Sequence, residues 1–343
     1  MLRLPPFQLR RPRTLEEAVS ILAGEGAAEG RARPVAGGTD LWPNMKRRHQ
    51  RADTVVALSG IDALRGIEAN GGVRIGAGVT LAEVAAHPAV RERYPALARA
   101  VESISSPPLR NMGTLGGNVC VDTRCTYYNQ TEEWRRSIDY CMKEAGTICW
   151  VAPSSPRCWA HSASDSAPML AALGAELRLV GPQGDRTIPV EDLYRDDGID
   201  YLGKTADEVV AEVLVPRESA ADRLKASFWK LRRRGSIDFA VLSVAAAVRT
   251  EEDGTVRDAR IVLGAVSSRP AAAEKAAAAL VGRPLTAESI AEAAKLARRH
   301  ATPMDNTDFQ AQWRGAVVPS YVEAALRECA GLPTDRPTPG HPG

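Results

Sequence analysis

The first half of the chain alternates helical patterns with short β-like runs that end in glycine turns. A helix is predicted to begin after Thr14, because Thr14 and Glu17 have the spacing of a capping box and apolar residues follow at helical intervals. Further elements are expected as strands at 33–35 and 53–58, as helices at 80–86, 90–100 and 167–173, and as a hairpin over 176–189. The segment 105–118 is rich in Gly, Pro and Asn, so no regular element is expected there.

The second half is predicted to contain a separate α+β domain. Three β-like runs precede three helical patterns, an order that favours an antiparallel sheet covered by helices. The β-like runs are 226–231, 238–250 and 256–266, and the helical patterns are 271–281, 286–300 and 320–329. A polar joint at 216–222 separates the two parts. We therefore expect one domain over 1–218, a second over 219–330, and a disordered Pro/Gly-rich tail over 331–343.

Composition narrows the class of protein. The 343 residues are 44% hydrophobic and 25% charged, values typical of globular domains. The 44 Lys+Arg and 42 Asp+Glu leave a net charge of +2, which gives no bulk field to attract nucleic acid or an anionic membrane. No run approaches the ~20 apolar residues of a membrane span, and the N-terminus lacks the apolar stretch of a secretory signal. A cytoplasmic, multidomain protein is expected.

Two glycine-rich loops are the first candidates for ligand binding, at 36–40 (AGGTD) and 113–118 (GTLGGN). Paired glycines allow positive φ and a close approach of the backbone to a ligand. Successive N–H groups in such turns form nests that suit a pyrophosphate, although simple tight turns are the competing interpretation. Neither a Walker motif nor a GxGxxG turn is present, which disfavours P-loop and Rossmann folds.

Cysteine usage is the second unusual feature. Five of the six Cys lie between Cys120 and Cys158. Clustered cysteines in a cytosolic chain indicate metal or redox chemistry more often than disulfides. The last four of these five are separated by 16, 8 and 9 positions, without the C-x₂₋₄-C pairs of most zinc sites. A 4Fe–4S cluster, buried structural thiols and zinc all remain possible from the residues alone.

Four motifs in order carry a resemblance: PVAGGTDLW, LRNMGTLGGN, SDSAPMLAALGA and FWKLRRRGSIDFA. Together they resemble the FAD-binding medium subunit of the xanthine oxidase family of molybdenum hydroxylases. The resemblance covers nearly the whole chain. It implies an α+β protein with a two-part, vanillyl-alcohol-oxidase-like FAD-binding domain, followed by an α+β C-terminal domain with an antiparallel sheet.

The same resemblance implies the FAD contacts. The first loop would wrap the pyrophosphate with Pro34, Val35, Ala36, Gly37, Gly38, Thr39, Asp40 and Leu41. The second loop would approach the flavin and its phosphates with Thr114, Leu115, Gly116, Gly117 and Asn118. Asp165 would accept hydrogen bonds from FAD hydroxyls, Lys230 would supply a basic contact, and Val210 an apolar one. No side chain is expected to act as a catalytic acid or base, because the cofactors carry the chemistry.

The cysteine-rich segment narrows the resemblance further. Asn118 and Asp165 are 47 positions apart, whereas ordinary members of the family join these motifs by far fewer residues. An added four-Cys loop and the stretch RCTYYNQTEEWR resemble the β subunits of 4-hydroxybenzoyl-CoA reductases, a branch of that family. By this resemblance the insert 119–163 binds a 4Fe–4S cluster through Cys125, Cys141, Cys149 and Cys158. Cys120 and Cys329 would be free thiols.

The function implied is electron transfer. Electrons from ferredoxin would pass through the 4Fe–4S cluster and FAD to a 2Fe–2S small subunit. A molybdopterin-containing large subunit would then dehydroxylate 4-hydroxybenzoyl-CoA to benzoyl-CoA in anaerobic aromatic degradation, within a dimer of heterotrimers. Two alternatives remain: the FAD subunit of another molybdenum hydroxylase with NAD as acceptor, or a zinc-stabilised structural protein. Because the insert supplies neither FAD motif, we expect FAD and the cluster to bind largely independently.

Overall fold

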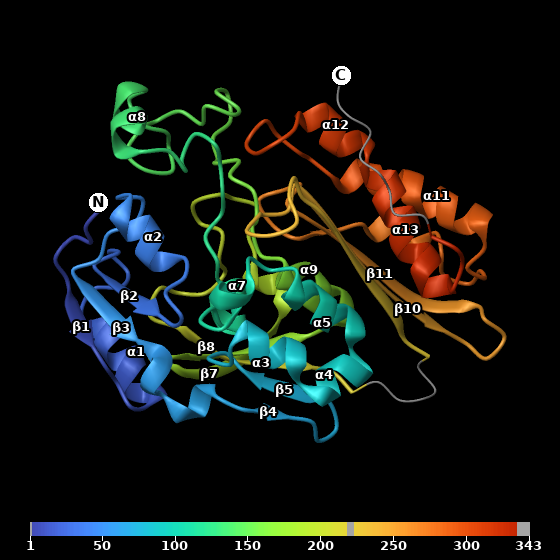
Figure 1. Cartoon of the computed structure of the whole chain (residues 1–343), viewed down its shortest axis with the longest axis horizontal. Helices are drawn as coiled ribbons and strands as arrows, with labels where there is room; N and C mark the ends of the chain where they lie inside the picture. The colour runs from blue at the N-terminus through green and yellow to red at the C-terminus, as the bar shows by residue number, and fades with distance from the viewer. Residues whose placement is uncertain (1, 218–222, 335–343) are drawn as a thin grey trace.

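The computed structural model describes residues 2–217 and 223–334. In this part of the chain the strands form sheets of three, five and four strands. The first two sheets belong to the N-terminal domain and the third to the C-terminal domain, which lie side by side in Figure 1. Most of the predicted joint and of the predicted disordered tail, residues 218–222 and 335–343, lies outside the described residues.

The N-terminal domain has a parallel sheet ordered β1-β3-β2 and an antiparallel sheet ordered β4-β5-β8-β6-β7. Its strands are β1 Gln8–Arg10, β2 Ala32–Val35, β3 Thr54–Ala57, β4 Ile67–Glu68, β5 Val73–Gly76, β6 Glu176–Gly181, β7 Gly184–Pro189 and β8 Val209–Val215. Its helices are α1 Leu15–Gly24, α2 Leu41–Lys46, α3 Leu81–Ala86, α4 Pro88–Arg93, α5 Pro95–Glu102, α6 Pro107–Arg110, α7 Leu115–Val119, α8 Glu132–Ser137 and α9 Ser166–Leu173. One continuous apolar core joins the antiparallel sheet to α1, α3, α4, α5, α7 and α9.

Local signals explain where several helices begin and end. The Thr14 hydroxyl accepts the N–H of Glu17 at 3.2 Å and starts α1 as predicted, although the Glu17 carboxylate bonds Arg13 N rather than Thr14 N. The predicted helix 90–100 is instead two helices, α4 and α5. The break falls at Tyr94, because a residue before proline is disfavoured in the helical region and Pro95 has no N–H to donate.

The expectation of no regular element at 105–118 was wrong. The segment forms two short helices, α6 and α7, separated by a turn that holds Gly113. Pro107 lies at the first position of α6, where proline's fixed φ is favourable, and the Thr114 side chain caps α7 by accepting Gly117 N at 3.1 Å. Proline and glycine here mark helix ends rather than a loop.

The C-terminal domain is an antiparallel sheet, ordered β12-β11-β10-β9, with helices on both faces. Its strands are β9 Lys225–Leu231, β10 Leu242–Thr250, β11 Val256–Gly264 and β12 Ala271–Ala272, and its helices are α10 Glu274–Ala278, α11 Ala287–Ala297, α12 Ala311–Ala316 and α13 Val318–Ala330. Helix α13 packs on β9 and β10, while α5 and α9 of the N-terminal domain pack on the sheet from its other side (Figure 1). The antiparallel sheet was predicted, but 271–281 splits into β12 and α10.

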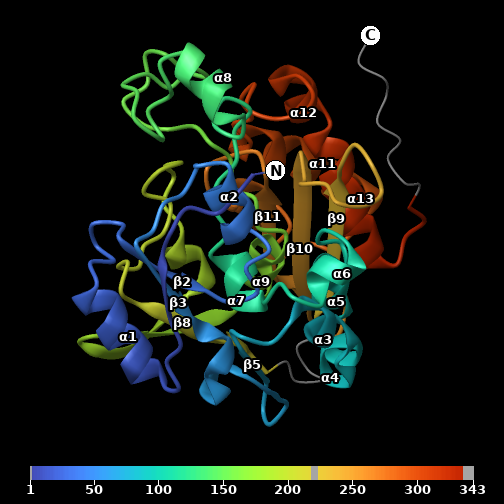
Figure 2. The same cartoon turned by 60° about the vertical axis from the view of Figure 1, so that its left-hand side comes forward.

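The cysteine-rich insert projects from the N-terminal domain. Figures 1 and 2 show it as irregular chain with the single short helix α8, placed above α2 and beside α12. It contacts both domains, through Tyr128 to His49 O and through Thr126 N to Asn306 O. Among the described residues, no helix is both long enough and apolar enough to cross a bilayer.

Candidate functional site

The two glycine loops, which are remote in sequence, lie against each other. The first follows β2 and the second leads into α7. A Cβ on Gly37 would overlap the carbonyl of Met112 and lie 2.9 Å from the Cα of Gly113. A Cβ on Gly113 would in turn lie 3.3 Å from Thr39 Oγ1. Gly37 is thus required for the contact between the loops, whatever ligand they hold.

The loops differ in what their N–H groups do. Among the described residues, the N–H groups of 37–40 donate to no protein acceptor, and Gly38 has φ +70°. The first loop therefore presents free donors that fit a pyrophosphate. In the second loop the backbone N–H groups already have protein acceptors, at 2.9–3.1 Å. Leu115 N donates to Val79 O, Gly116 N to Ala77 O, Gly117 N to Thr114 Oγ1, and Asn118 N to Thr114 O. The expected anion nest is absent from the second loop over 115–118.

The glycine pair of the second loop serves packing instead. A Cβ on Gly116 would lie 2.6 Å from the Cβ of Ala77, so only glycine lets α7 approach the chain after β5. Asn118 follows this pair and connects it to the motif SDSAPMLAALGA, which begins at Ser164. Its Oδ1 accepts hydrogen bonds from Ser164 Oγ at 3.0 Å and from Ser166 Oγ at 2.6 Å. Two of the predicted FAD motifs are thereby joined into one unit.

Asp40, at the end of the first loop, is linked to the cysteine insert. Its carboxylate forms an ion pair with Arg124, the residue before Cys125, and accepts Asn44 Nδ2 at 2.9 Å. Burial raises the pKa of Asp40, and the nearby Arg124 opposes that rise. Arg124 also lies over the ring of Phe239, 5.0 Å from its centroid. The root of the insert thus touches both a predicted FAD loop and the C-terminal domain.

The predicted contacts Asp165 and Lys230 meet each other. Lys230 Nζ, on β9, lies 2.6 Å from Asp165 Oδ2 and donates to Ser103 O at 3.1 Å. Burial raises the pKa of Asp165, while Lys230 opposes the rise. Val210 lies on β8, buried in the main core and paired with Leu179 of β6. The other predicted contacts lie in or next to the first loop. Pro34 and Val35 end β2, Ala36 begins the loop, and Leu41 begins α2.

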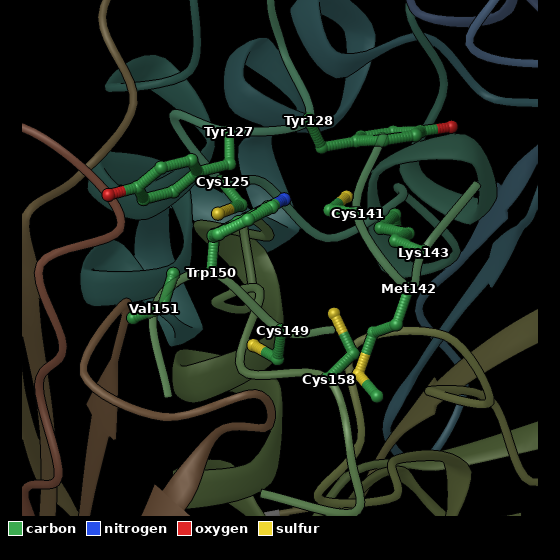
Figure 3. Close-up of a pocket in the computed structure, with 10 residues that line it drawn as sticks. All are labelled: Cys125, Tyr127, Tyr128, Cys141, Met142, Lys143, Cys149, Trp150, Val151 and Cys158. Atoms are coloured by element: carbon green, nitrogen blue, oxygen red, sulfur yellow. The ribbon is translucent and has the colours of Figure 1, made fainter. Parts of the chain in front are cut away.

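The four predicted cysteine ligands surround one cavity. Figure 3 shows Cys125, Cys141, Cys149 and Cys158 around it, together with aromatic side chains. The remaining lining residues are Tyr127, Tyr128, Met142, Lys143, Trp150 and Val151. All four cysteines are buried. Cys120 and Cys329 do not line this cavity.

Backbone N–H groups surround the four sulfurs. Ala160 N donates to Cys158 Sγ at 3.4 Å. At the other three thiols, nearby backbone N–H groups favour the charged form: those of Tyr127 and Tyr128 at Cys125, that of Lys143 at Cys141, and those of Val151, Ala152 and Trp159 at Cys149. Interaction with Cys158 lowers the pKa of the Cys149 thiol, and its backbone neighbours lower it further. Burial raises the pKa of Cys125 to about 11 and also raises that of Cys141.

Residues outside the insert hold it in place. Asn306 of the C-terminal domain donates from Nδ2 to Trp159 O at 2.6 Å, and its carbonyl accepts Thr126 N at 2.9 Å. The Tyr128 hydroxyl donates to His49 O at 2.6 Å, and their rings lie 4.8 Å apart. Arg135, in α8, donates to Arg47 O at 2.7 Å.

Sequence reasoning missed several of these positions, above all Arg124, Lys143 and Asn306. The available signal was only that Arg124 and Lys143 lie within two residues of predicted ligands. Among the described residues, no group of three or more His, Cys, Asp or Glu is arranged to hold a metal ion.

Comparison with known proteins agrees with this architecture. A family model for the FAD-binding domain in molybdopterin dehydrogenase matches residues 5–218, and one for the CO dehydrogenase flavoprotein C-terminal domain matches residues 226–329. The aldehyde oxidoreductase FAD-binding subunit of Escherichia coli (strain K12) is 32% identical over 259 residues, covering 73% of this chain and 79% of the relative. The carbon monoxide dehydrogenase medium chain of Hydrogenophaga pseudoflava is 27% identical over 331 residues, covering 95% and 99%.

A solved structure gives the same result. Carbon monoxide dehydrogenase from Hydrogenophaga pseudoflava, lacking the Mo-pyranopterin moiety, matches with a TM-score of 0.78 and 27% identity over 96% of this chain and 99% of that chain. Because the FAD-binding model alone spans more than half of the sequence, the protein belongs to the FAD-binding subunits of the molybdenum hydroxylase family of oxidoreductases.

Proposed function

We propose that this FAD-binding subunit also carries a 4Fe–4S cluster and transfers electrons in an enzyme of the 4-hydroxybenzoyl-CoA reductase type. The observation that carries the proposal is the convergence of four buried cysteines on one cavity, where a backbone N–H group also donates to the sulfur of Cys158. Hydrogen bonds to sulfur and restricted solvent access are two of the factors that set the potential of an iron–sulfur cluster.

The donor set fits a cluster better than a single ion. Zinc holds each thiolate sulfur at about 2.3 Å, which draws four of them close together. Here the cysteines instead surround a cavity, whose walls include Tyr127, Tyr128 and Trp150. Four cysteines match a cubane cluster in number, because each of its four iron atoms takes one thiolate. Aromatic walls limit solvent access, as expected around a redox group.

The residues of the first loop fit FAD in the same way. The free N–H groups of 37–40 are the donors that a pyrophosphate needs. The second loop packs against the first at Gly37 and Gly113. When bound, the cluster exchanges single electrons and the flavin accumulates two, so the pair connects a one-electron donor to a two-electron reaction. The chain's own residues hold both groups, exclude water and fix the distance between them.

The proposed partners follow from this role. Reduced ferredoxin is the donor, and a 2Fe–2S small subunit passes electrons to a molybdopterin-containing large subunit, in a dimer of heterotrimers. The overall reaction is balanced by two electrons and two protons: 4-hydroxybenzoyl-CoA loses its para hydroxyl as water and becomes benzoyl-CoA. The thioester is bound by the large subunit. This subunit contributes no acid or base to the reaction.

The test is cofactor analysis of protein purified without oxygen. We expect iron, acid-labile sulfide and FAD in the wild type, with an EPR signal of a reduced 4Fe–4S cluster. Cys141→Ser should lose or convert that signal while retaining most of the FAD, because a hydroxyl is a poor ligand for iron. Cys329→Ser is the matched control, since this buried thiol lies on α13 and does not line the cavity. Zinc in place of iron in the wild type, or unchanged iron in Cys141→Ser, would refute the cluster.

A second candidate function is supported by the relatives, several of which are named as dehydrogenases. In that case the flavin would deliver electrons to NAD rather than receive them from ferredoxin. Rapid-mixing reduction of the complete complex separates the two functions. Reduced ferredoxin should bleach the flavin quickly and NADH should not; saturable reduction by NADH would favour the dehydrogenase.

A further inference from the structure

One cation lines the cysteine cavity. Among the described lining residues, Lys143 is the only basic one, and its side chain is 6% exposed. It follows Cys141 by two positions, and its backbone N–H lowers the pKa of the Cys141 thiol. Figure 3 shows it on the same side of the cavity as Cys141 and Tyr128.

The ammonium group is held in a fixed position. Its three N–H donors match three acceptors: Asp122 Oδ1 at 2.7 Å, Thr123 Oγ1 at 2.6 Å and Gly198 O at 2.5 Å. Thr123 Oγ1 itself donates to Gly198 O at 2.6 Å, so the acceptors are ordered as well. A lysine with every donor satisfied cannot turn away into solvent without losing three charge-assisted hydrogen bonds.

Aromatic rings flank this ammonium group. Its Nζ lies 5.2 Å from the centroid of Tyr128 and 5.4 Å from that of Tyr201, within the range of cation–π attraction. The rings also limit the water that would otherwise screen the charge. At low effective dielectric, a charge acts more strongly and over a longer distance than it does at the surface.

The partner carboxylate lies outside the cavity wall. Asp122 does not line the cavity, its other oxygen accepts Gln50 Nε2 at 3.0 Å, and Arg124 is a further cation near it. Of the two members of this ion pair, only Lys143 borders the cysteine cavity. The positive charge of Lys143 acts on the sulfurs of both Cys141 and Cys158.

We propose that Lys143 tunes the four-cysteine site electrostatically, raising the reduction potential of the group bound there. This inference rests on the proposed function. A cluster with four thiolates gains one negative charge when it takes up one electron from an external one-electron donor, and no bond forms or breaks. A fixed cation nearby stabilises the reduced state more than the oxidised state, so Lys143 favours electron entry from the donor side.

The experiment is a redox titration of the full-length protein in its assembled complex, followed by EPR of the reduced cluster. Lys143→Met removes the charge and keeps the length of the side chain, whereas Lys143→Arg keeps the charge. We expect Lys143→Met to lower the equilibrium constant for one-electron reduction about tenfold, which is about 59 mV. Lys143→Arg should remain close to the wild type. A structural role alone would change iron content without this dependence on charge.

The outcomes separate the two proposals. Absence of an iron–sulfur signal in the wild type would refute the proposed function, and with it this inference. Full iron with an unchanged potential in Lys143→Met would refute the role of Lys143 alone. If Lys143→Met loses iron, the potential of Asp122→Asn tests the role of Lys143 instead. This variant removes the negative charge that pairs with Lys143 and keeps the lysine. A higher potential in Asp122→Asn supports the inference, and an unchanged or lower potential overturns it.

Discussion

Lys230 and Asp165 form one buried ion pair that joins the two domains, with Nζ 2.6 Å from Oδ2 and both side chains no more than 5% exposed. Asp165 lies at the start of α9 in the N-terminal domain, and Lys230 lies in β9 of the C-terminal sheet. Sequence motifs had assigned each residue to FAD. In the structure each is the partner of the other, so both motifs also define how the domains meet.

Breaking this pair should destabilise the protein strongly. Lys230→Met leaves an unpaired buried carboxyl group, and removal of one partner from such a pair costs about 3–5 kcal/mol of unfolding free energy. The measurement is urea unfolding of single and double variants. Lys230→Met combined with Asp165→Leu should cost less than Lys230→Met alone, because no uncompensated charge remains. A loss below about 1 kcal/mol in the single variant would show that the pair behaves like an exposed one.

Gly37→Val should abolish FAD retention. The new side chain would overlap the Met112 carbonyl, so the two loops could not keep their contact. We expect loss of the flavin absorbance from purified protein, together with a lower midpoint of thermal unfolding. Gly24→Ala is the control, because nothing lies within 4 Å of a Cβ at that position. Full FAD occupancy in Gly37→Val would contradict the assignment of the first loop.

Asn306→Ala should loosen the insert while the domains remain folded. The variant loses the 2.6 Å hydrogen bond to Trp159 O and leaves that carbonyl without this donor, at a cost of about 1–3 kcal/mol. Limited proteolysis should then cut within 119–163 faster than in the wild type. Asp308→Ala, which removes only an exposed ion pair with Arg233, should leave the cleavage rate unchanged. Equal protection of the insert in both variants would contradict the role of Asn306.

Acid should destabilise the protein through His161. Burial, together with the nearby Arg314, lowers the pKa of His161 from 6.5 to about 3. The unfolded chain binds a proton below pH 6.5 while the folded chain does not. The stabilisation is thus complete above pH 6.5 and is lost as pH falls toward 3, by up to about 1.4 kcal/mol per pH unit.

The measurement for His161 is the pH dependence of urea unfolding between pH 7 and 5. In the wild type, Ser162 O accepts a hydrogen bond from His161 Nδ1 at 3.0 Å. His161→Asn keeps a side-chain N–H for this carbonyl, but the asparagine side chain does not titrate. Its unfolding free energy should fall less steeply with acid than that of the wild type. Identical slopes for the two proteins would show that His161 does not contribute.

The sequence allowed the elements with strong local signals to be predicted. The cap at Thr14 located the start of α1, and helical spacing located α3, because these signals act within one or two helical turns. The parallel pairing of β1 with β3 was not predictable, because it joins segments with no local signal for each other. The break between α4 and α5 was also missed, because the apolar spacing continues across Tyr94 and Pro95 although the helical backbone does not.

The candidate site divides in the same way. Residue type and spacing showed an unusual group of cysteines, and the resemblance selected Cys125, Cys141, Cys149 and Cys158, which line one cavity. Their supports could not be predicted. Arg124 pairs with Asp40, from which it is separated by 84 positions in the sequence. Asn306 donates to Trp159 O, which is 147 positions away. Contacts of this kind are created by the fold and leave no pattern along the chain.

The ion pair between Asp40 and Arg124 connects the first loop to the cysteine insert. Arg124 directly precedes Cys125, so a ligand held by the insert would act on the first loop through this pair. Any free energy that occupancy of one site contributes to the other is matched by an equal contribution in the opposite direction. A Cys141→Ser variant that keeps most of its FAD would therefore show that this coupling is small compared with the binding free energy of FAD itself.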